Sequence, residues 1–167
     1  MNILVTVASK HGATGEIGDV VAGVVRDAGL GVETRALDRV DSLDGFDSVI
    51  LGSAVNAGRW MGSATHFADR FAAELASRDV WLFSSGPTGD VPMPKDDPPA
   101  ALALLARLGA HEHRSFAGRL DRSQLGFMER AITGAVKAPE GDFRDWNAIR
   151  AWGAEIAAAL ARPKVAA

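Results

Sequence analysis

The chain has 167 residues, of which 47% are hydrophobic and 23% are charged, and its formal net charge is −3. This length and near-average composition indicate a single globular domain over residues 1–167, and they exclude the disordered, collagen-like and coiled-coil classes. The 18 basic residues are scattered among 21 acidic ones, so the sequence also argues against nucleic-acid binding.

Three absences narrow the possible class of protein further. The chain contains no cysteine, which excludes disulfides, thiol catalysis and cysteine-based metal sites, and we expect no metal site of another kind. No apolar run approaches the roughly 18 residues of a membrane-spanning helix. Met1 is followed by Asn2 and an apolar run, without the basic segment of a secretory signal, so we expect a cytoplasmic location.

The first half of the chain alternates short β-rich runs with amphipathic helices. Residues 3–8 form a near-continuous apolar run, which is typical of a buried parallel strand. Apolar residues then recur at helical spacing over residues 17–28, and a glycine ends this stripe. Residues 31–37 and 48–53 are predicted as the second and third strands, and residues 64–75 as the second helix.

The second half continues the same alternation. Residues 80–84 are predicted as the fourth strand, residues 98–108 as a helix that begins with prolines, and residues 112–117 as the fifth strand. A last helix spans residues 149–160 and is followed by a proline. Five strands separated by helices predict an α/β fold: a doubly wound parallel sheet with right-handed crossovers and helices on both faces.

The fold class locates the functional site before any motif is considered. In doubly wound sheets, ligands bind outside the carboxyl ends of the strands, at the point where the strand order reverses. The loops that follow three of the predicted strands are rich in glycine or small polar residues: residues 9–14, 54–60 and 85–91. We therefore expect the site to be formed by these three loops.

The first loop suits a phosphate monoester. It comprises Ser9, Lys10, His11, Gly12, Ala13 and Thr14. Ser9 and Thr14 offer hydroxyl donors, Gly12 permits close backbone approach, and the first N–H groups of the following helix point into the loop. A hydrogen bond to a charged group contributes about 1.5–3 kcal/mol, against about 0.3–1 kcal/mol for a charge at an exposed helix end. The amides and hydroxyls of the loop should therefore contribute more to phosphate binding than the charge of Lys10. The alternative is a structural turn that needs its glycine and cap only to close.

Other phosphate-binding patterns match less well. Gly12, Gly15 and Gly18 have the spacing G-x-x-G-x-x-G, which differs from the G-x-G-x-x-G of dinucleotide-binding domains, although Asp38 and Arg35 could then meet a ribose and its phosphate. A phosphoacceptor receiver domain would need acidic residues at the ends of the first and third strands. The Gly-Lys-Thr run of nucleotide hydrolases is absent.

These residues resemble the flavodoxin-like family. Its phosphate loop, Ser/Thr-x-x-Gly-x-Thr after the first strand, is matched by Ser9, Gly12 and Thr14. The resemblance implies the strand order 2-1-3-4-5 and noncovalent FMN as the cofactor. The second loop resembles the family's loop beside the isoalloxazine ring and contains Ser53, Ala54, Val55, Asn56, Ala57, Gly58, Arg59 and Trp60. The third loop resembles the one that meets the polar edge of the ring and contains Ser85, Gly86, Pro87, Thr88, Gly89 and Asp90.

Within that family, the chain is most similar to the menaquinone-dependent protoporphyrinogen oxidases. The run ILGSAVNAGRW at residues 50–60, the tail EGDFRDWNAIRAWGAEIA at residues 140–157, and an insertion at residues 119–139 before the last helix carry this likeness. It implies an FMN-dependent oxidoreductase that passes electrons from a small molecule to a quinone. The alternatives are a flavodoxin-type electron-transfer protein and a non-enzymatic module without FMN. No catalytic side chain is evident.

Several side chains near the expected ring have two interpretations. The chain has no tyrosine, so Trp60 alone is expected to stack on the isoalloxazine, unless it packs on the next helix. An open second ring face favours an enzyme over an electron carrier. Arg59 would either stabilise an anionic reduced flavin or lie on the surface. Asp90 would either accept a hydrogen bond from the flavin ring or cap a turn. His11 would add a donor to FMN or face solvent.

The insertion at residues 119–139 has an amphipathic pattern. Its apolar residues at helical spacing are Leu125, Met128, Ala131, Ile132, Ala135 and Val136. Such a stripe is usually core, so we expect it to pack against the sheet. A homodimer contact or substrate lid is the second interpretation, and peripheral membrane contact is the third. Arg119, Arg122, Arg130 and Lys137 against Asp121 and Glu129 give a net charge of only +2.

Overall fold

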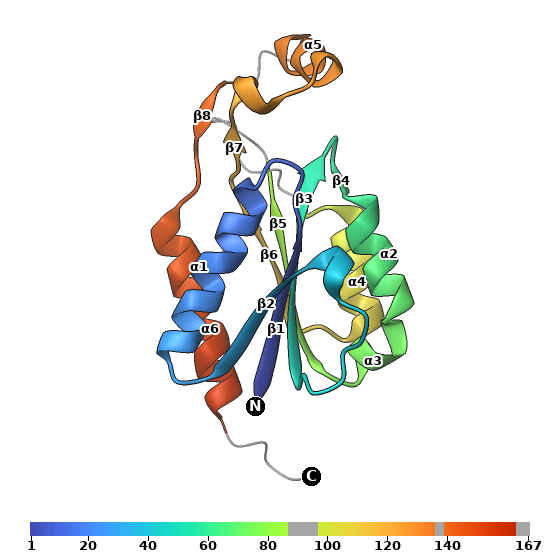
Figure 1. The fold of residues 1–167 in the computed structure, drawn as a ribbon, viewed down its shortest axis with the longest axis vertical. Helices are drawn as coiled ribbons and strands as arrows, with labels where there is room; N and C mark the ends of the chain where they lie inside the picture. Colours follow the sequence, from blue (N-terminus) through green and yellow to red (C-terminus); the bar gives the residue numbers. More distant parts are fainter. Residues whose placement is uncertain (87–96, 136–138, 163–167) are drawn as a thin grey trace.

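A computed structural model describes residues 1–86, 97–135 and 139–162. Strands and helices alternate along most of the chain (Figure 1). The strands are β1 (Asn2–Ala8), β2 (Gly31–Ala36), β3 (Ser48–Asn56), β4 (Arg59–Trp60), β5 (Asp79–Ser85), β6 (Glu112–Phe116), β7 (Arg119–Leu120) and β8 (Gly141–Asp142). The α-helices are α1 (Ala13–Asp27), α2 (Gly62–Arg70), α3 (Ala72–Ala76), α4 (Pro99–Leu108), α5 (Phe127–Ala135) and α6 (Trp146–Ala161), and short 3-10 helices span Leu37–Arg39 and Arg122–Gln124.

The main sheet has the predicted architecture. Its five long strands are parallel and run in the order β2-β1-β3-β5-β6. Counted without the two-residue β4, this is the expected 2-1-3-4-5 order. Strand order reverses between β1 and β3, so the carboxyl ends of these two strands flank the switch point. The expected second helix is divided at Phe71 into α2 and α3.

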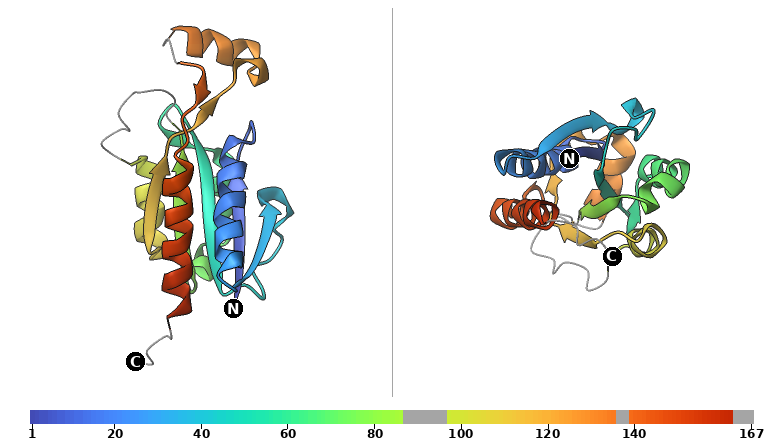
Figure 2. Two further views of the ribbon diagram at one scale, coloured as in Figure 1. Left: turned by 90° about the vertical axis from the view of Figure 1, so that its left-hand side faces the viewer. Right: turned by 90° about the horizontal axis from the view of Figure 1, so that it is seen from below.

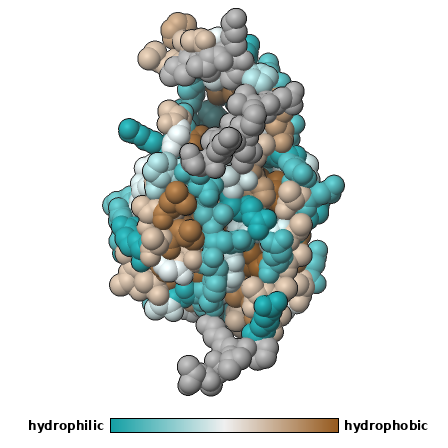
Figure 3. Space-filling model, turned by 180° about the vertical axis from the view of Figure 1, so that it is seen from behind, coloured by the Kyte–Doolittle hydropathy of each residue, from teal (hydrophilic) through white to brown (hydrophobic). Residues whose placement is uncertain are grey.

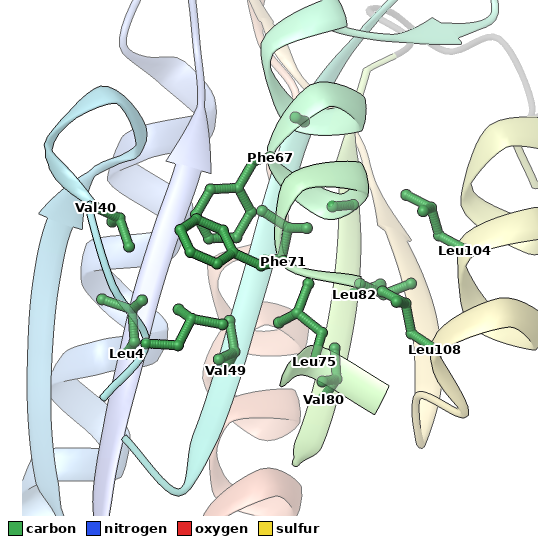
Figure 4. Packing of buried hydrophobic residues seen from close by; sticks show 14 of the residues in the cluster. Leu4, Val40, Val49, Phe67, Phe71, Leu75, Val80, Leu82, Leu104 and Leu108 are labelled. Atoms are coloured by element: carbon green, nitrogen blue, oxygen red, sulfur yellow. The ribbon is translucent and has the colours of Figure 1, made fainter. Parts of the chain in front are cut away.

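Each face of the sheet has its own hydrophobic core. On one face, Leu4, Val49 and Leu82 of the strands pack toward Phe67 and Phe71 of the α2–α3 segment (Figure 4). The helices α2, α3 and α4 cover this face, and α1 and α6 cover the other (Figure 1). Burial on both faces explains why β1 and β5 have near-continuous apolar sequences instead of alternating ones.

The second core is centred on aromatic side chains. Trp152 of α6 is fully buried, and its ring meets Phe83 of β5 and Phe116 of β6 edge-on at centroid distances of 5.7 and 5.6 Å. The Trp152 indole N–H donates to the carboxylate of Glu112. Gly153 lets α6 approach α1, because a Cβ there would lie 3.1 Å from Val24.

An arm, residues 119–142, rises from the carboxyl end of the sheet between β6 and α6 (Figure 2). Its base is the antiparallel pair β7–β8, and its tip is α5. Arg144 fixes the base. Its side chain is 2% exposed, donates to Asp142 at 2.6 and 2.8 Å, and reaches Glu16 and the Ala13 carbonyl of α1 at 2.8 and 2.9 Å. The arm is thereby attached to the start of α1.

The expectation that the stripe in this segment packs against the sheet is contradicted for Met128, Ala131 and Ala135, whereas Leu125 is half-buried and Val136 lies outside the described residues. Phe127 and Met128 are 87% and 72% exposed, and Ala131 and Ala135 are also exposed. The arm carries α5 beyond the end of the sheet (Figure 1), and neither hydrophobic core includes a described residue of α5. The top of the molecule, where α5 lies, accordingly includes apolar surface (Figure 3).

No helix in the described parts of the chain is long and apolar enough to cross a membrane.

Candidate functional site

A cavity of about 350 Å³ lies at the carboxyl ends of β1, β3 and β5, beneath the arm. Its volume falls within the range of small-molecule sites, about 300–1,000 Å³. Residues from all three expected loops and from the arm line it: Ser9, Lys10, His11, Ala13, Thr14, Ala54, Val55, Asn56, Met61, Ser85, Gly86, Gly118, Arg119, Leu120, Leu125, Glu129 and Thr133. The cavity therefore lies where the sheet topology predicts a ligand site.

The β1–α1 loop presents unpaired donors to this cavity. Gly12 precedes α1 in the left-handed region with φ +80°, a conformation that favours glycine, and no side chain caps the helix. The first intrahelical bond runs from Glu16 N–H to Gly12 O, so the preceding amides have no helical acceptor. Thr14 is 2% exposed and lines the cavity. In the described ranges, no hydrogen bond engages the hydroxyl of Ser9 or Thr14. This donor set suits an oxyanion.

The arm supplies an anionic group above this loop. Glu129 of α5 accepts from Lys10 Nζ at 2.7 Å, and its same oxygen lies 3.2 Å from His11 Nε2. Hydrogen bonds from Lys10, from the Gly126 backbone N–H and from His11 lower the pKa of Glu129 to about 2. His11 is thus engaged by the arm, an arrangement that neither interpretation of His11 anticipated.

Close backbone packing forms another wall. Gly86 follows β5, and its N–H donates to Phe116 O at 3.0 Å. A Cβ at Gly86 would lie 3.1 Å from Val55 Cβ, and one at Gly118 would lie 3.4 Å from Gly86 Cα. Glycine at both positions lets the end of β5 approach β3 and the base of the arm.

The second loop is a β-hairpin instead of an irregular loop. β3 continues to Asn56, and Ala57 and Gly58 form a two-residue turn with φ +49° and +74° that leads into β4. Positive φ at both central residues is the mark of a type I′ turn. Ala54, Val55 and Asn56 line the cavity, whereas the turn and β4 lie outside its lining.

The expected stacking role of Trp60 is contradicted. Its side chain is buried in the core beside α2 and α4, and its indole N–H donates to Ser84 Oγ at 2.7 Å. Burying this large ring is more favourable than exposing it at the cavity rim, because the indole N–H keeps a hydrogen-bond partner in the core. The alternative interpretation, packing on the following helix, agrees with this position.

Ser84, His113 and Asp97 form a chain of polar groups behind Trp60. Ser84 Oγ lies 2.7 Å from His113 Nε2. His113 Nδ1 lies 3.2 Å from Asp97 Oδ1 but makes no hydrogen bond there, and this oxygen accepts from the Ser115 hydroxyl. The three residue types follow the order of a serine-hydrolase triad, in which the serine must be accessible to substrate. Here the serine is the inaccessible member. Ser84 is buried and Asp97 is partly exposed. A hydroxyl without access to substrate cannot act as a nucleophile, so this network is structural.

The structure brings together ten of the residues expected at the site, namely Ser9, Lys10, His11, Ala13, Thr14, Ala54, Val55, Asn56, Ser85 and Gly86. Gly12 shapes the loop without lining the cavity. Ser53 is turned inward, where its hydroxyl meets Ala54 O and Met61 N–H. Ala57, Gly58, Arg59 and Trp60 lie outside the lining, and Pro87, Thr88, Gly89 and Asp90 lie outside the described residues.

Seven lining residues were not expected from the sequence. They are Met61, Gly118, Arg119, Leu120, Leu125, Glu129 and Thr133, and all but Met61 come from the arm or the residue before it. The only feature of the sequence that could have indicated these residues was the insertion at residues 119–139, for which a substrate lid was one of the interpretations.

Solved structures share this fold. A flavodoxin from the domain Archaea superposes with a TM-score of 0.65 at 14% identity, covering 97% of this chain and 100% of that one. Flavodoxin 1 from Bacillus cereus gives a TM-score of 0.62 at 20% identity over 93% and 96%. The rubredoxin:oxygen oxidoreductase of Desulfovibrio gigas gives 0.66 at 13%, where 95% of this chain covers 36% of the larger protein.

No curated protein matches the sequence significantly. The family profile of the flavodoxin domain, however, matches residues 4–147, which include most of β1, all the other strands of the main sheet and residues 119–142 of the arm. The chain therefore belongs to the flavodoxin domain family.

Proposed function

We propose that the protein binds FMN, with the phosphate in the β1–α1 loop, and acts as an FMN-dependent oxidoreductase. The observation that carries this proposal is the set of unpaired donors around Ala13 and Thr14, which line a cavity at the switch point of a flavodoxin-domain sheet. When bound, FMN would supply the electron-transfer chemistry, since such chemistry belongs to the cofactor.

The residues present fit a phosphate-bearing ligand. The loop amides and the hydroxyls of Ser9 and Thr14 would hold the phosphate. The N-terminal end of α1, which lies at this loop, favours negative charge. The carboxylate of Glu129 already occupies Lys10 and His11, which supports the affinity of this loop for oxyanions. Ala54, Val55, Met61 and Leu125 give the rest of the cavity an apolar lining suited to a planar ring.

The composition of the cavity favours an enzyme over an electron carrier. Among the described lining residues, none is phenylalanine, tyrosine or tryptophan. A ring held without aromatic cover leaves space for a substrate to stack on it. The sequence resemblance supports a porphyrinogen as the electron donor and a quinone as the electron acceptor. Anaerobic reduction of the bound flavin by protoporphyrinogen, followed by reoxidation with a menaquinone analogue, tests it.

The phosphate loop is tested by titrating FMN and riboflavin against the apoprotein and its variants. Thr14→Val and Gly12→Val should each weaken FMN binding by about tenfold or more, because each removes or displaces hydrogen bonds to a charged group. Thr34→Val, on exposed β2, is the matched control and should leave affinity unchanged. Riboflavin should bind more weakly than FMN to the wild type. Unchanged FMN affinity in both loop variants would overturn the assignment.

A further inference from the structure

Glu129 joins the arm to the β1–α1 loop through two side chains. Lys10 Nζ donates to Glu129 Oε1 at 2.7 Å, and His11 Nε2 lies 3.2 Å from the same oxygen. The other oxygen accepts the backbone N–H of Gly126 at 2.9 Å. The carboxylate is therefore held in one orientation, with one oxygen toward the arm and the other toward the loop.

The rest of α5 makes few polar attachments to the sheet. Within residues 1–86, 97–135 and 139–162, every hydrogen bond and ion pair from α5 to a residue outside the arm involves Glu129. The Thr133 hydroxyl bonds to carbonyls of α5 itself, and Arg130 bonds to carbonyls at residues 122 and 123 of the arm. Phe127 and Met128 point into solvent. The polar attachment of the tip therefore depends on one carboxylate.

An oxyanion in the β1–α1 loop would compete with this carboxylate. Lys10 and His11 belong to the same short loop as the unpaired amides that precede α1. A phosphate monoester carries roughly 1.5–2 negative charges near neutral pH, so it attracts these two side chains more strongly than a carboxylate does. Two anions a few ångströms apart also repel each other. Binding of phosphate and docking of Glu129 are thus mutually unfavourable.

We infer that Glu129 is a latch that holds α5 over the cavity, and that a phosphate-bearing ligand opens the latch by taking over Lys10 and His11. The inference rests on the proposed function, because it places the phosphate in the β1–α1 loop. Access to the cavity is then regulated by its own ligand, and the arm opens when the phosphate site is filled. By linkage, phosphate shifts the equilibrium between the closed and the open arm by the same factor by which the open arm binds phosphate more tightly than the closed arm, about fivefold or more.

The test measures the position of the arm directly. The chain has no cysteine, so Met128→Cys on α5 and Ser63→Cys on α2 create a unique pair for spin labels at two exposed positions. Double electron–electron resonance then gives the distance distribution without ligand, with inorganic phosphate, with FMN and with riboflavin, at matched ionic strength. We expect one narrow distribution without ligand and a broader, longer one with phosphate or FMN. Riboflavin, which has no phosphate, should leave it narrow.

Variants separate the latch from the binding site. Glu129→Gln should broaden the distribution without ligand, whereas Glu74→Gln, the same charge change on exposed α3, should not. A narrow distribution in Glu129→Gln would overturn the latch. Calorimetric titration in parallel distinguishes the remaining outcomes. If phosphate binds but the arm stays closed, the latch fails and the proposed function stands. If neither phosphate nor FMN binds, both fail.

Discussion

At the scale of single residues, the hydroxyl of Ser84 is the polar partner of two buried side chains. It accepts the Trp60 indole N–H and lies 2.7 Å from His113 Nε2, and the His113 side chain is 1% exposed. Ser84→Ala should lower the free energy of unfolding by about 1–3 kcal/mol, because both groups lose a buried partner. Urea unfolding monitored by tryptophan fluorescence measures it. Ser63→Ala, on the surface of α2, should change stability by less than about 0.5 kcal/mol, and an equal loss in both variants would contradict the argument.

Glu129 makes a second residue-scale prediction, on pH. Its pKa is about 2 in the folded protein, below the ordinary value of 4.5, so folding favours its ionised form. The resulting stabilisation is complete above pH 4.5 and is lost as the pH falls from about 4.5 to about 2. The difference in unfolding free energy between wild type and Glu129→Gln should therefore be constant at neutral pH, fall as the pH drops below about 4.5, and vanish only below about pH 2. A series of urea titrations measures it, and a difference independent of pH would be evidence against the ion pair.

At the scale of elements, the β3–β4 hairpin contains a residue in an unfavourable conformation. Ala57 has φ +49°, where a side chain costs about 1–2 kcal/mol, while its neighbour Gly58 has φ +74° at no such cost. Ala57→Gly should therefore raise the unfolding free energy by about 0.5–1 kcal/mol after the entropy of glycine is included. Gly58→Ala should lower it by about 1 kcal/mol. Thermal unfolding of the two variants gives the comparison, and shifts of the same sign would contradict it.

At the scale of the whole molecule, the sequence predicts the sheet well because its signals are local. The apolar run at residues 3–8 and the stripe at residues 17–28 each identify one element, and alternation along the chain then implies parallel pairing. The place of the β1–α1 loop at the cavity was predictable for the same reason, since Ser9, Gly12 and Thr14 are neighbours in the sequence. The hairpin was missed because Ala57 replaces the asparagine or glycine that usually marks a type I′ turn.

The arm could not be placed from the sequence. Helical spacing around Leu125 and Met128 indicates an apolar face but not the surface that it meets, and the rule that such faces are core is wrong here. Glu129 contacts Lys10 across 119 positions of sequence, and nothing local marks that pairing. Trp60 shows a related limit: two partners, a flavin ring and the core, suit the same indole, and only three-dimensional packing decides between them.

The base of the arm has a consequence for how such a protein can evolve. Phe143 N–H donates to Gly118 O at 3.1 Å, so the segment leaves and re-enters the sheet layer at almost one point. Closure entropy then depends only weakly on the length between these ends, by about 0.6 kcal/mol for each doubling. The arm can therefore be lengthened, shortened or replaced while both hydrophobic cores stay intact. Such changes would alter which molecules reach the cavity.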